Sequence, residues 1–483
     1  METLKEKTAK GLLWGGMNNF IQQGLGLVFG IILGRLLSPD DYGMVAMIAI
    51  FPQLAIAIQN SGFTAALTNI RKPEHRDYNS VFWFNVIVGT ALYAILFFCA
   101  PLIAAYYHTD KLTPLCRYAF LNILFASFAT AQSAYLFKNL MVKQQAKCGM
   151  TAVICSNIVG VSMAFAGMSY WSLATQGLVY VGVNMLLLWR SSPWRPTLSI
   201  DFGPVRRMFR FSVKVLATGI VSQISNNVLN ILLGRYFSPH AVGCYNQASQ
   251  WSSKCCYLVQ GTVQQVAQPV LAGLGGQDGR QLAALRKMVR FASFVSFPLL
   301  FGLALVAKEF IVTAITAKWL PSAELLQLLC VGWSVMPLHT LMSNAVLSNG
   351  HSGTNFWCTV GLGAASIATM VAIWPLGIRT MVVAYAALNI MWVFVWLFFV
   401  RRLMGYGLLM FLRDTLPFAL AAAAVMAATS AATAWISSTV ALLAARTVMA
   451  AALYYAVMRA ARVRILRECE QFIISRIRKK DKQ

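Results

Sequence analysis

The chain has 483 residues, of which 58% are hydrophobic and only 11% are charged. Soluble domains carry roughly a quarter of charged residues, so this composition excludes an ordinary soluble protein and indicates a polytopic membrane protein. The net charge of +25 comes from 40 lysines and arginines against 15 acidic residues. These basic residues alternate from loop to loop instead of gathering on one soluble face, which excludes a nucleic-acid partner.

Apolar segments long enough to cross a hydrocarbon layer of about 30 Å follow one another along the whole chain. The connections between them are too short to hold a soluble domain. We therefore expect an all-α polytopic membrane protein of about 14 transmembrane helices. In chain order the predicted spans are 12–36, 43–68, 80–106, 115–137, 149–168, 171–189, 211–237, 242–272, 289–313, 323–348, 355–376, 380–400, 415–436 and 439–458.

The loops that follow the even-numbered spans carry most of the basic residues. Lys138, Lys143 and Lys147 follow the fourth span, and Arg286 and Arg290 follow the eighth. By the positive-inside rule, both termini of this multi-pass chain are cytoplasmic. The basic excess also favours contact with the anionic surface of the phospholipid bilayer.

A ten-residue pattern occurs twice, two hundred positions apart. The stretch 34–43, GRLLSPDDYG, matches the stretch 234–243, GRYFSPHAVG, in the form G-R-x-x-S-P-x-x-x-G. Because the interval contains six spans, both copies run in the same direction through the membrane. The repeat therefore predicts two six-helix lobes related by an axis along the membrane normal, plus two C-terminal helices.

These lobes give the predicted domain organisation. Between the lobes, the prolines, arginines and Trp194 suit a segment in the headgroup layer. The expected parts are an N-terminal lobe at 1–190, a cytoplasmic inter-lobe linker at 191–210, a C-terminal lobe at 211–402, two further spans at 403–460, and a basic amphipathic cytoplasmic tail at 461–483.

The eighth span is the most polar of the predicted spans. Gln250, Lys254 and Gln264 belong to a stripe of amides at three- and four-residue spacings, which places them on one helix face. Lys254 lies about twelve residues, or roughly 18 Å, from the outer end, too deep to reach the interface easily. No acidic residue in this helix can pair with it, so a water-filled cavity or an anionic ligand is one expected partner. Packing against carbonyl groups of a neighbouring helix is the alternative.

Spans one and seven also carry amides, among them Gln22, Gln23 and Asn226. They line a polar path or form hydrogen bonds between helices. Arg35 and Arg235 end these two spans at the outer side. Each is a candidate for anion binding or an anchor to headgroups, with Asp40 or Asp41 as possible counter-charges for Arg35.

Several kinds of site are missing from the sequence. The carboxylates fall in loops, tails or helix ends, which disfavours a cation exporter. The ten cysteines are scattered and form no cluster with histidine, so we expect no metal site and no cofactor. We found no nucleotide-binding loop or nucleophile motif, and we expect no catalytic residues. A cationic, amide-rich cavity instead suits an anionic substrate that bears a glycan.

Three sequence stretches support a resemblance to a known family: 10–14 (KGLLW), 34–43 (GRLLSPDDYG) and 61–63 (SGF). With the predicted spans, they resemble the polysaccharide transporter (Wzx/WzxC-like) family, which shares a superfamily (MOP) with the MATE exporters and the MurJ lipid II flippase. The resemblance covers essentially the whole chain. A cluster of arginines inside span one, as in MurJ, is absent here.

The resemblance implies a flippase of the bacterial cytoplasmic (inner) membrane. It would move an undecaprenyl-diphosphate-linked oligosaccharide, the repeat unit of an O-antigen, capsule or exopolysaccharide, from the inner to the outer leaflet. The resemblance also implies a cavity between the lobes in which cationic residues meet the diphosphate. H+ or Na+ as coupling ion, and a glycan polymerase and glycosyltransferases as pathway partners, are further implications.

We accordingly expect Lys254, with Arg35 or Arg235, to bind the diphosphate. Position 54, which corresponds to Lys254 in the first lobe, is a leucine, so charge recognition is expected mainly in the second lobe. The alternatives are a membrane-embedded enzyme of glycan assembly and a MATE-like exporter of small molecules. The residues expected to line the glycan path are Gln22, Gln23, Asn226, Gln250 and Gln264.

Overall fold

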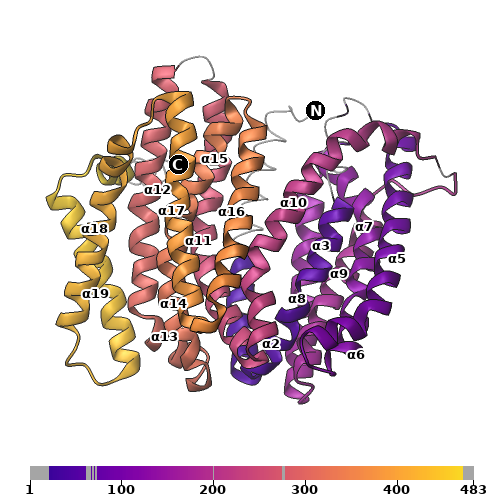
Figure 1. Cartoon of the computed structure of the whole chain (residues 1–483), viewed down its shortest axis with the longest axis horizontal. Coiled ribbons are helices and arrows are strands. Elements are labelled where there is room, and N and C mark those ends of the chain that lie inside the picture. Colours follow the sequence, from indigo (N-terminus) through magenta and orange to yellow (C-terminus); the bar gives the residue numbers. More distant parts are fainter. Residues whose placement is uncertain are drawn as a thin grey trace, which may run out of the picture. The chain divides into compact units, whose positions relative to one another are not determined.

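The computed structural model describes residues 21–60, 67, 70, 73–199, 201–274 and 278–471. Every regular element in these residues is a helix, and the chain divides into two compact units, Met1–Asn246 and Gln247–Gln483 (Figure 1). The predicted all-helical fold is therefore confirmed.

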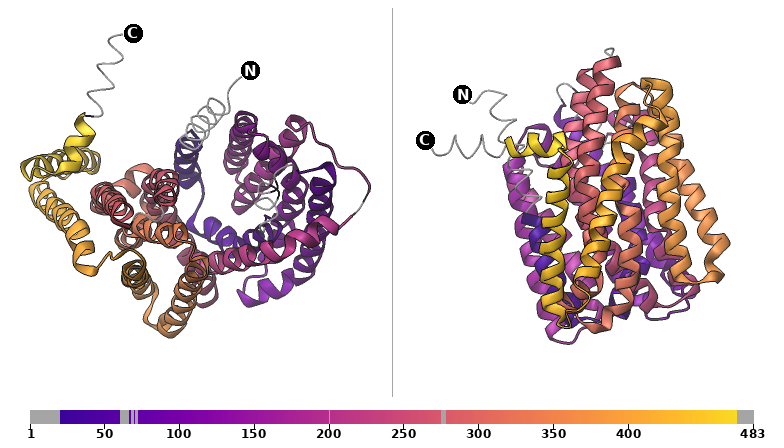
Figure 2. Two further views of the ribbon diagram at one scale, coloured as in Figure 1. Left: turned by 90° about the horizontal axis from the view of Figure 1, so that it is seen from above. Right: turned by 90° about the vertical axis from the view of Figure 1, so that its left-hand side faces the viewer.

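The first unit is a bundle in which α8 packs along α9, and α7 packs on both α5 and α9. Figure 2 shows its helices nearly end-on. A helix through Ile21–Leu36 comes first. The later helices are α2 (Pro39–Ile48), α3 (Ile50–Asn60), α5 (His75–Tyr106), α6 (Leu112–Ala119), α7 (Leu121–Lys138), α8 (Val142–Phe165), α9 (Tyr170–Ser191), α10 (Gly203–Tyr236) and the beginning of α11 (Pro239–Gly273).

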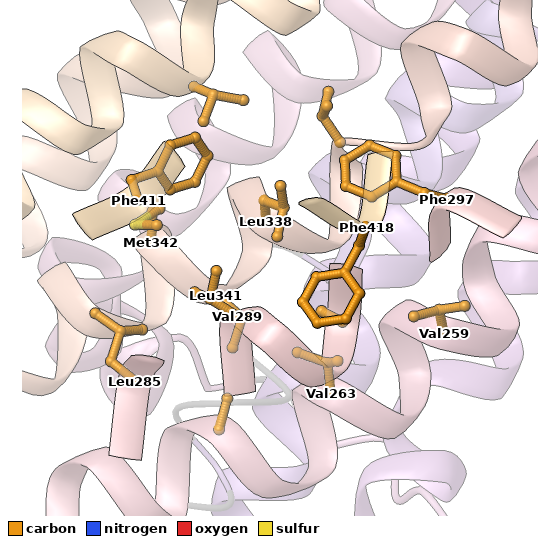
Figure 3. Packing of buried hydrophobic residues seen from close by; sticks show 14 of the residues in the cluster. Val259, Val263, Leu285, Val289, Phe297, Leu338, Leu341, Met342, Phe411 and Phe418 are labelled. Atoms are coloured by element: carbon orange, nitrogen blue, oxygen red, sulfur yellow. The ribbon is translucent and has the colours of Figure 1, made fainter. Parts of the chain in front are cut away.

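The helices of the second unit pack around one large apolar core. Val263 of α11, Leu341 and Phe418 belong to it, and Figure 3 shows their packing. Besides the rest of α11, the unit contains α12 (Asp278–Leu305), α13 (Ala307–Ala314), η1 (Ala317–Trp319), α14 (Leu320–Trp333), α15 (Met336–Ser348), α16 (Ser352–Ile373), η2 (Trp374–Leu376), α17 (Ile378–Met404), α18 (Leu408–Ala432) and α19 (Thr439–Ala460).

Eleven helical segments among the described residues are long and apolar enough to cross a membrane. The predicted spans 12–36, 211–237 and 242–272 are not among these eleven. Residues 21–36 form a shorter apolar helix, whereas α10 and α11 are long helices rich in amides. The multi-pass architecture is thus confirmed, while the number of fourteen spans stays a prediction.

Several predicted spans are pairs of shorter helices. The span 43–68 breaks at Ala49, the span 115–137 at Phe120, and the span 323–348 just before Pro337. Proline suits the first turn of a helix, because an N–H group at that position would have no acceptor within the helix. The Nε2 of His339 in that helix lies 2.9 Å from the carbonyl oxygen of Asn389 on α17.

The predicted linker is fastened to the beginning of α5. The side-chain amide of Asn79 donates to the carbonyl of Ser199 at 2.6 Å and accepts from the backbone N–H of Thr197 at 2.9 Å. Trp194, expected among headgroups, is only 6% exposed and packs with Tyr78 and other aromatic rings of the first unit. Burial of its large apolar surface outweighs the interfacial preference of tryptophan.

Replacing Asn79 with alanine is expected to loosen this segment. The change removes two hydrogen bonds and exposes their backbone partners, at a cost of about 1–3 kcal/mol. Hydrogen exchange of residues 192–199 should become faster. Asn139→Ala is the matched control, because the exposed Asn139 amide donates within its own helical turn, to the carbonyl of Tyr135. Equal protection in both variants would show that Asn79 does not hold the segment.

Candidate functional site

The ten-residue repeat, 34–43 and 234–243, contains the start of a helix in each copy, and we call each copy a repeated corner. In the first copy, the hydroxyl of Ser38 accepts from the N–H of Asp41 at 3.2 Å, and the Asp41 carboxylate accepts from the N–H of Ser38 at 2.8 Å. Ser38 is thus the N-cap of α2 and Pro39 its first residue. In the second copy, Ser238 similarly accepts from the N–H of Ala241 at 3.3 Å before α11. The serine and proline of the motif are explained by capping.

The two corners interlock within the first unit. A methyl group on Gly43 would overlap the carbonyl oxygen of Pro239, and one on Gly243 would overlap the carbonyl oxygen of Pro39. Each glycine therefore lets the backbone of the other copy approach closely. Asp40 and His240, at the same position in the two copies, approach to 3.3 Å. The repeat thus builds a reciprocal contact between α2 and α11.

Arg235 is tied to the end of α5. Its guanidinium donates to the carbonyl of Tyr106, contacts His108 and lies 5.0 Å from the centre of the Tyr106 ring. A cation is favourable there because the carbonyl groups at a helix C-terminus carry partial negative charge. Arg35, its counterpart in the first copy, is exposed. The Asp41 carboxylate, considered as its counter-charge, accepts from the N–H and the hydroxyl of Ser38 in the cap.

The amides of α10 divide by face. Asn227 donates to the Gln53 side chain on α3 at 2.9 Å, so it joins two helices, as expected of interhelical amides. Its neighbour Asn226 is exposed. At the other predicted positions of the first unit, Gln23 is exposed and Gln22 is half-buried beside Gly149 of α8.

α11 has an apolar face and a polar face. Val259, Val263, Ala267 and Leu271 recur every fourth residue and are buried in the core of the second unit. Gln250 and Gln264 are exposed, and Lys254 is half-buried. At about 100° per residue, these three lie within roughly 80° of one another. The structure therefore brings the three predicted residues of this helix onto one accessible face.

Lys254 lies over the ring of Trp251, with Nζ 4.7 Å from the ring centre. Such a cation–π contact orients the ammonium group. Gln247 Oε1 and Trp251 Nε1, which lie two turns and one turn before Lys254, are buried and have no hydrogen-bond partner among the described residues. The polar face of α11 thus carries an oriented cation.

Two buried carboxylates that pair with arginines were not predicted from the sequence. Asp414, predicted to precede a span that starts at 415, lies inside α18 with its side chain 0% exposed and bound to Arg286 and Arg290. Glu309 pairs with Arg446 at 2.9 Å. Both oxygens of the Asp414 carboxylate accept from arginine, whereas at Glu309 only Oε1 accepts from Arg446. Within the described residues, no group of three or more potential metal ligands occurs.

Comparison with known proteins identifies the relatives of this architecture. The chain is 24% identical to the teichuronic acid biosynthesis protein TuaB of Bacillus subtilis, over 85% of this chain and 83% of the relative. It is also 24% identical to the lipopolysaccharide biosynthesis protein WzxC of Escherichia coli, over 68% and 67%, and to the succinoglycan biosynthesis transport protein ExoT of Rhizobium meliloti, over 86% and 83%.

A family described as polysaccharide biosynthesis protein matches residues 32–324, which is more than half of the chain. The chain belongs to this family. The match begins two residues before the first repeated corner and contains the second corner and the polar face of α11. The family expected from the sequence is confirmed.

Two solved structures share the fold of this family member. The lipid II flippase MurJ in an inward closed conformation superposes with a TM-score of 0.75 at 15% identity, over 93% of this chain and 99% of MurJ. An inward-facing multidrug resistance MATE transporter gives a TM-score of 0.66 at 14% identity, over 82% and 98%. The MurJ- and MATE-like fold predicted from the sequence is confirmed.

Proposed function

We propose that this member of the polysaccharide biosynthesis protein family is a flippase and not an enzyme. It moves an undecaprenyl-diphosphate-linked oligosaccharide from the inner to the outer leaflet of a bacterial cytoplasmic membrane by alternating access. The names of three relatives support this proposal, since they refer to the biosynthesis of teichuronic acid, lipopolysaccharide and succinoglycan, and one of them refers to transport.

The polar face of α11 is the observation that carries the proposal. This helix has membrane length, and its apolar face is buried in the core. Its accessible face, by contrast, presents two amides and the cation of Lys254. A polar helix face in a membrane protein must meet water, protein or a polar ligand, because unsatisfied polar groups cost several kcal/mol in lipid. Amides suit the hydroxyl groups of a glycan, and an ammonium group suits a diphosphate.

The arrangement proposed around this helix extends the sequence predictions. Fourteen spans form two six-helix lobes and two C-terminal helices, with both termini in the cytoplasm. The proposed parts keep their boundaries: 1–190, 191–210, 211–402, 403–460 and 461–483. An H+ or Na+ gradient drives the cycle, and glycosyltransferases and a polymerase of the same pathway supply and consume the substrate.

We assign Lys254 as the main contact of the diphosphate, with Arg35 or Arg235 as a second cation. The contact of Arg235 with the end of α5 fixes the position of its guanidinium group. Arg235 would therefore attract the diphosphate by long-range electrostatics, without moving its side chain toward it. The proposed glycan path is lined by Gln22, Gln23, Asn226, Gln250 and Gln264.

Replacing Lys254 with alanine is expected to reduce polysaccharide export about ten- to a hundredfold, because a hydrogen bond to a charged group contributes roughly 1.5–3 kcal/mol. Lys254→Arg should retain part of the activity, since it keeps the charge. Export is measured in a strain that lacks the chromosomal copy, with protein abundance measured in parallel. Lys308→Ala, which removes an exposed lysine of α13, is the matched control. Export by Lys254→Ala at the rate of the unmodified protein would contradict the diphosphate role.

A further inference from the structure

A basic pocket lies in the second unit, away from the polar face of α11. It has a volume of about 430 Å³ and is open to the surface. Arg286, Lys287 and Arg290 of α12 line it together with Arg464 and Glu468 of the segment after α19. Its volume falls within the range of roughly 300–1,000 Å³ that is typical of small-molecule sites.

Asp414 holds two of these cations in place. Its fully buried carboxylate accepts from Arg286 Nε at 2.8 Å and Nη2 at 3.1 Å, from Arg290 Nε at 2.6 Å, and from the Tyr406 hydroxyl at 3.1 Å. Burial and the nearby Asp414 raise the pKa of Tyr406, so this hydroxyl remains a donor. The other guanidinium nitrogens of both arginines have no hydrogen-bond partner in the described part of the chain. They are pre-oriented donors for an anion.

The remaining charges of the pocket belong to the segment after α19. Glu468 pairs with Lys287 at 2.6 Å and with Arg464 at 3.5 Å. The hydrogen bond from Lys287 lowers the pKa of the Glu468 carboxyl, which therefore stays ionised at neutral pH. Four cations thus meet the carboxylates of Glu468 and Asp414. Two positive charges remain uncompensated by these groups.

An apolar pocket adjoins the basic pocket. It has a volume of about 650 Å³ and shares the residues Lys287, Ile465 and Glu468 with it. Val263 and Val270 of α11 and Met288 and Phe291 of α12 contribute its apolar lining. Adjoining basic and apolar pockets at the ends of membrane helices suit a molecule that has an anionic head and a hydrocarbon tail.

We propose that this pair of pockets is a binding site for an anionic phospholipid of the inner leaflet. Its phosphate is bound by Arg286, Arg290 and the cations of the segment after α19, and one acyl chain enters the apolar pocket. The positive-inside rule places this end of α12 on the cytoplasmic side, where such headgroups are available. A zwitterionic lipid fits less well, because its ammonium group would meet uncompensated positive charge. The site is independent of the proposed flippase function.

The test is lipid binding to the delipidated, full-length protein in detergent, measured by native mass spectrometry. The variant is Lys287→Gln with Arg464→Gln, which leaves the contacts of Asp414 intact, and both single variants are measured as well. The control, Arg401→Gln with Arg402→Gln, removes two exposed cations from the predicted cytoplasmic end of α17. Each protein receives phosphatidylglycerol, phosphatidylethanolamine, a polyprenyl diphosphate or inorganic phosphate.

We expect phosphatidylglycerol to bind the unmodified and control proteins more tightly than phosphatidylethanolamine does. Loss of two cations should weaken its binding about thirtyfold, which corresponds to about 1 kcal/mol for each basic residue. Equal binding of the two phospholipids, or full binding by the double variant, overturns the proposal. Tighter binding of polyprenyl diphosphate through Lys287 and Arg464 would assign the pockets to the carrier lipid. If inorganic phosphate binds as tightly as phosphatidylglycerol, the pockets are an anion site and the lipid proposal is wrong.

Discussion

Replacing Gly43 with alanine is expected to lower both the thermal stability and the transport activity of the protein. The added methyl group would overlap the carbonyl oxygen of Pro239, which belongs to the backbone and has no alternative rotamer. Overpacking of this kind typically costs about 1–3 kcal/mol, and rigid backbone at the contact favours the upper end of that range. Gly243→Ala should have a similar effect, because it overlaps the carbonyl oxygen of Pro39.

Gly219→Ala in α10 is the matched control. Apart from the backbone of its own helix, no atom of the described residues lies within 4 Å of the position that its methyl group would take. Alanine in a helix interior is favoured over glycine by about 0.5–1 kcal/mol. This variant should be as stable as the unmodified protein or slightly more stable. The midpoint of thermal unfolding in detergent is the measurement. If Gly43→Ala and Gly219→Ala unfold at the same temperature, the reciprocal contact of the two corners is wrong.

Replacing Asp414 with asparagine is expected to destabilise the second unit by about 2–3 kcal/mol. A neutral amide cannot balance two guanidinium groups, and breaking a fully buried ion pair costs about 3–5 kcal/mol. The expected value is smaller because the arginine side chains are 28% and 43% exposed and retain some contact with water. The change should lower the unfolding midpoint and weaken the binding of the anionic phospholipid, since both arginines lose their orientation.

Two further variants separate the parts of this effect. Tyr406→Phe removes one hydrogen bond to Asp414 and should cost only about 1 kcal/mol. Asp40→Asn removes an exposed carboxylate that pairs with His240 and should cost less than about 1 kcal/mol. A loss of stability in Asp414→Asn no larger than that in Asp40→Asn would contradict the role of Asp414.

The repeated corner illustrates how far the sequence predicted the fold. Its serine and proline indicate a helix start from local chemistry alone, and its recurrence indicates a duplication. The interlocking of Gly43 with Pro239 was not predictable, because a glycine in a helix carries no information about which distant backbone approaches it. The same limit applies to Trp194. Its local sequence is equally compatible with a position among lipid headgroups and with burial in the protein core.

The polar positions show a similar division. The four-residue spacing in α11 correctly predicted that Gln250, Lys254 and Gln264 share a face, because helix periodicity is a local property. The partners of Asp414 and Arg446 come from helices far away in the sequence, so these ion pairs required the tertiary structure. Arg235 contacts a carbonyl group at the end of α5. The sequence repeat alone could not distinguish this contact from a contact with a ligand.

Transbilayer movement of an intact lipid-linked oligosaccharide tests the central claim most directly. The purified protein is placed in vesicles that carry the substrate in one leaflet, and a membrane-impermeant glycan reagent reports its arrival in the other. Arrival should be faster than in protein-free vesicles and in vesicles with Lys254→Ala, and the mass of the substrate should stay unchanged. A changed mass would indicate an enzyme of glycan assembly. Movement of small cations without the glycolipid would indicate an exporter, and either result would contradict the flippase.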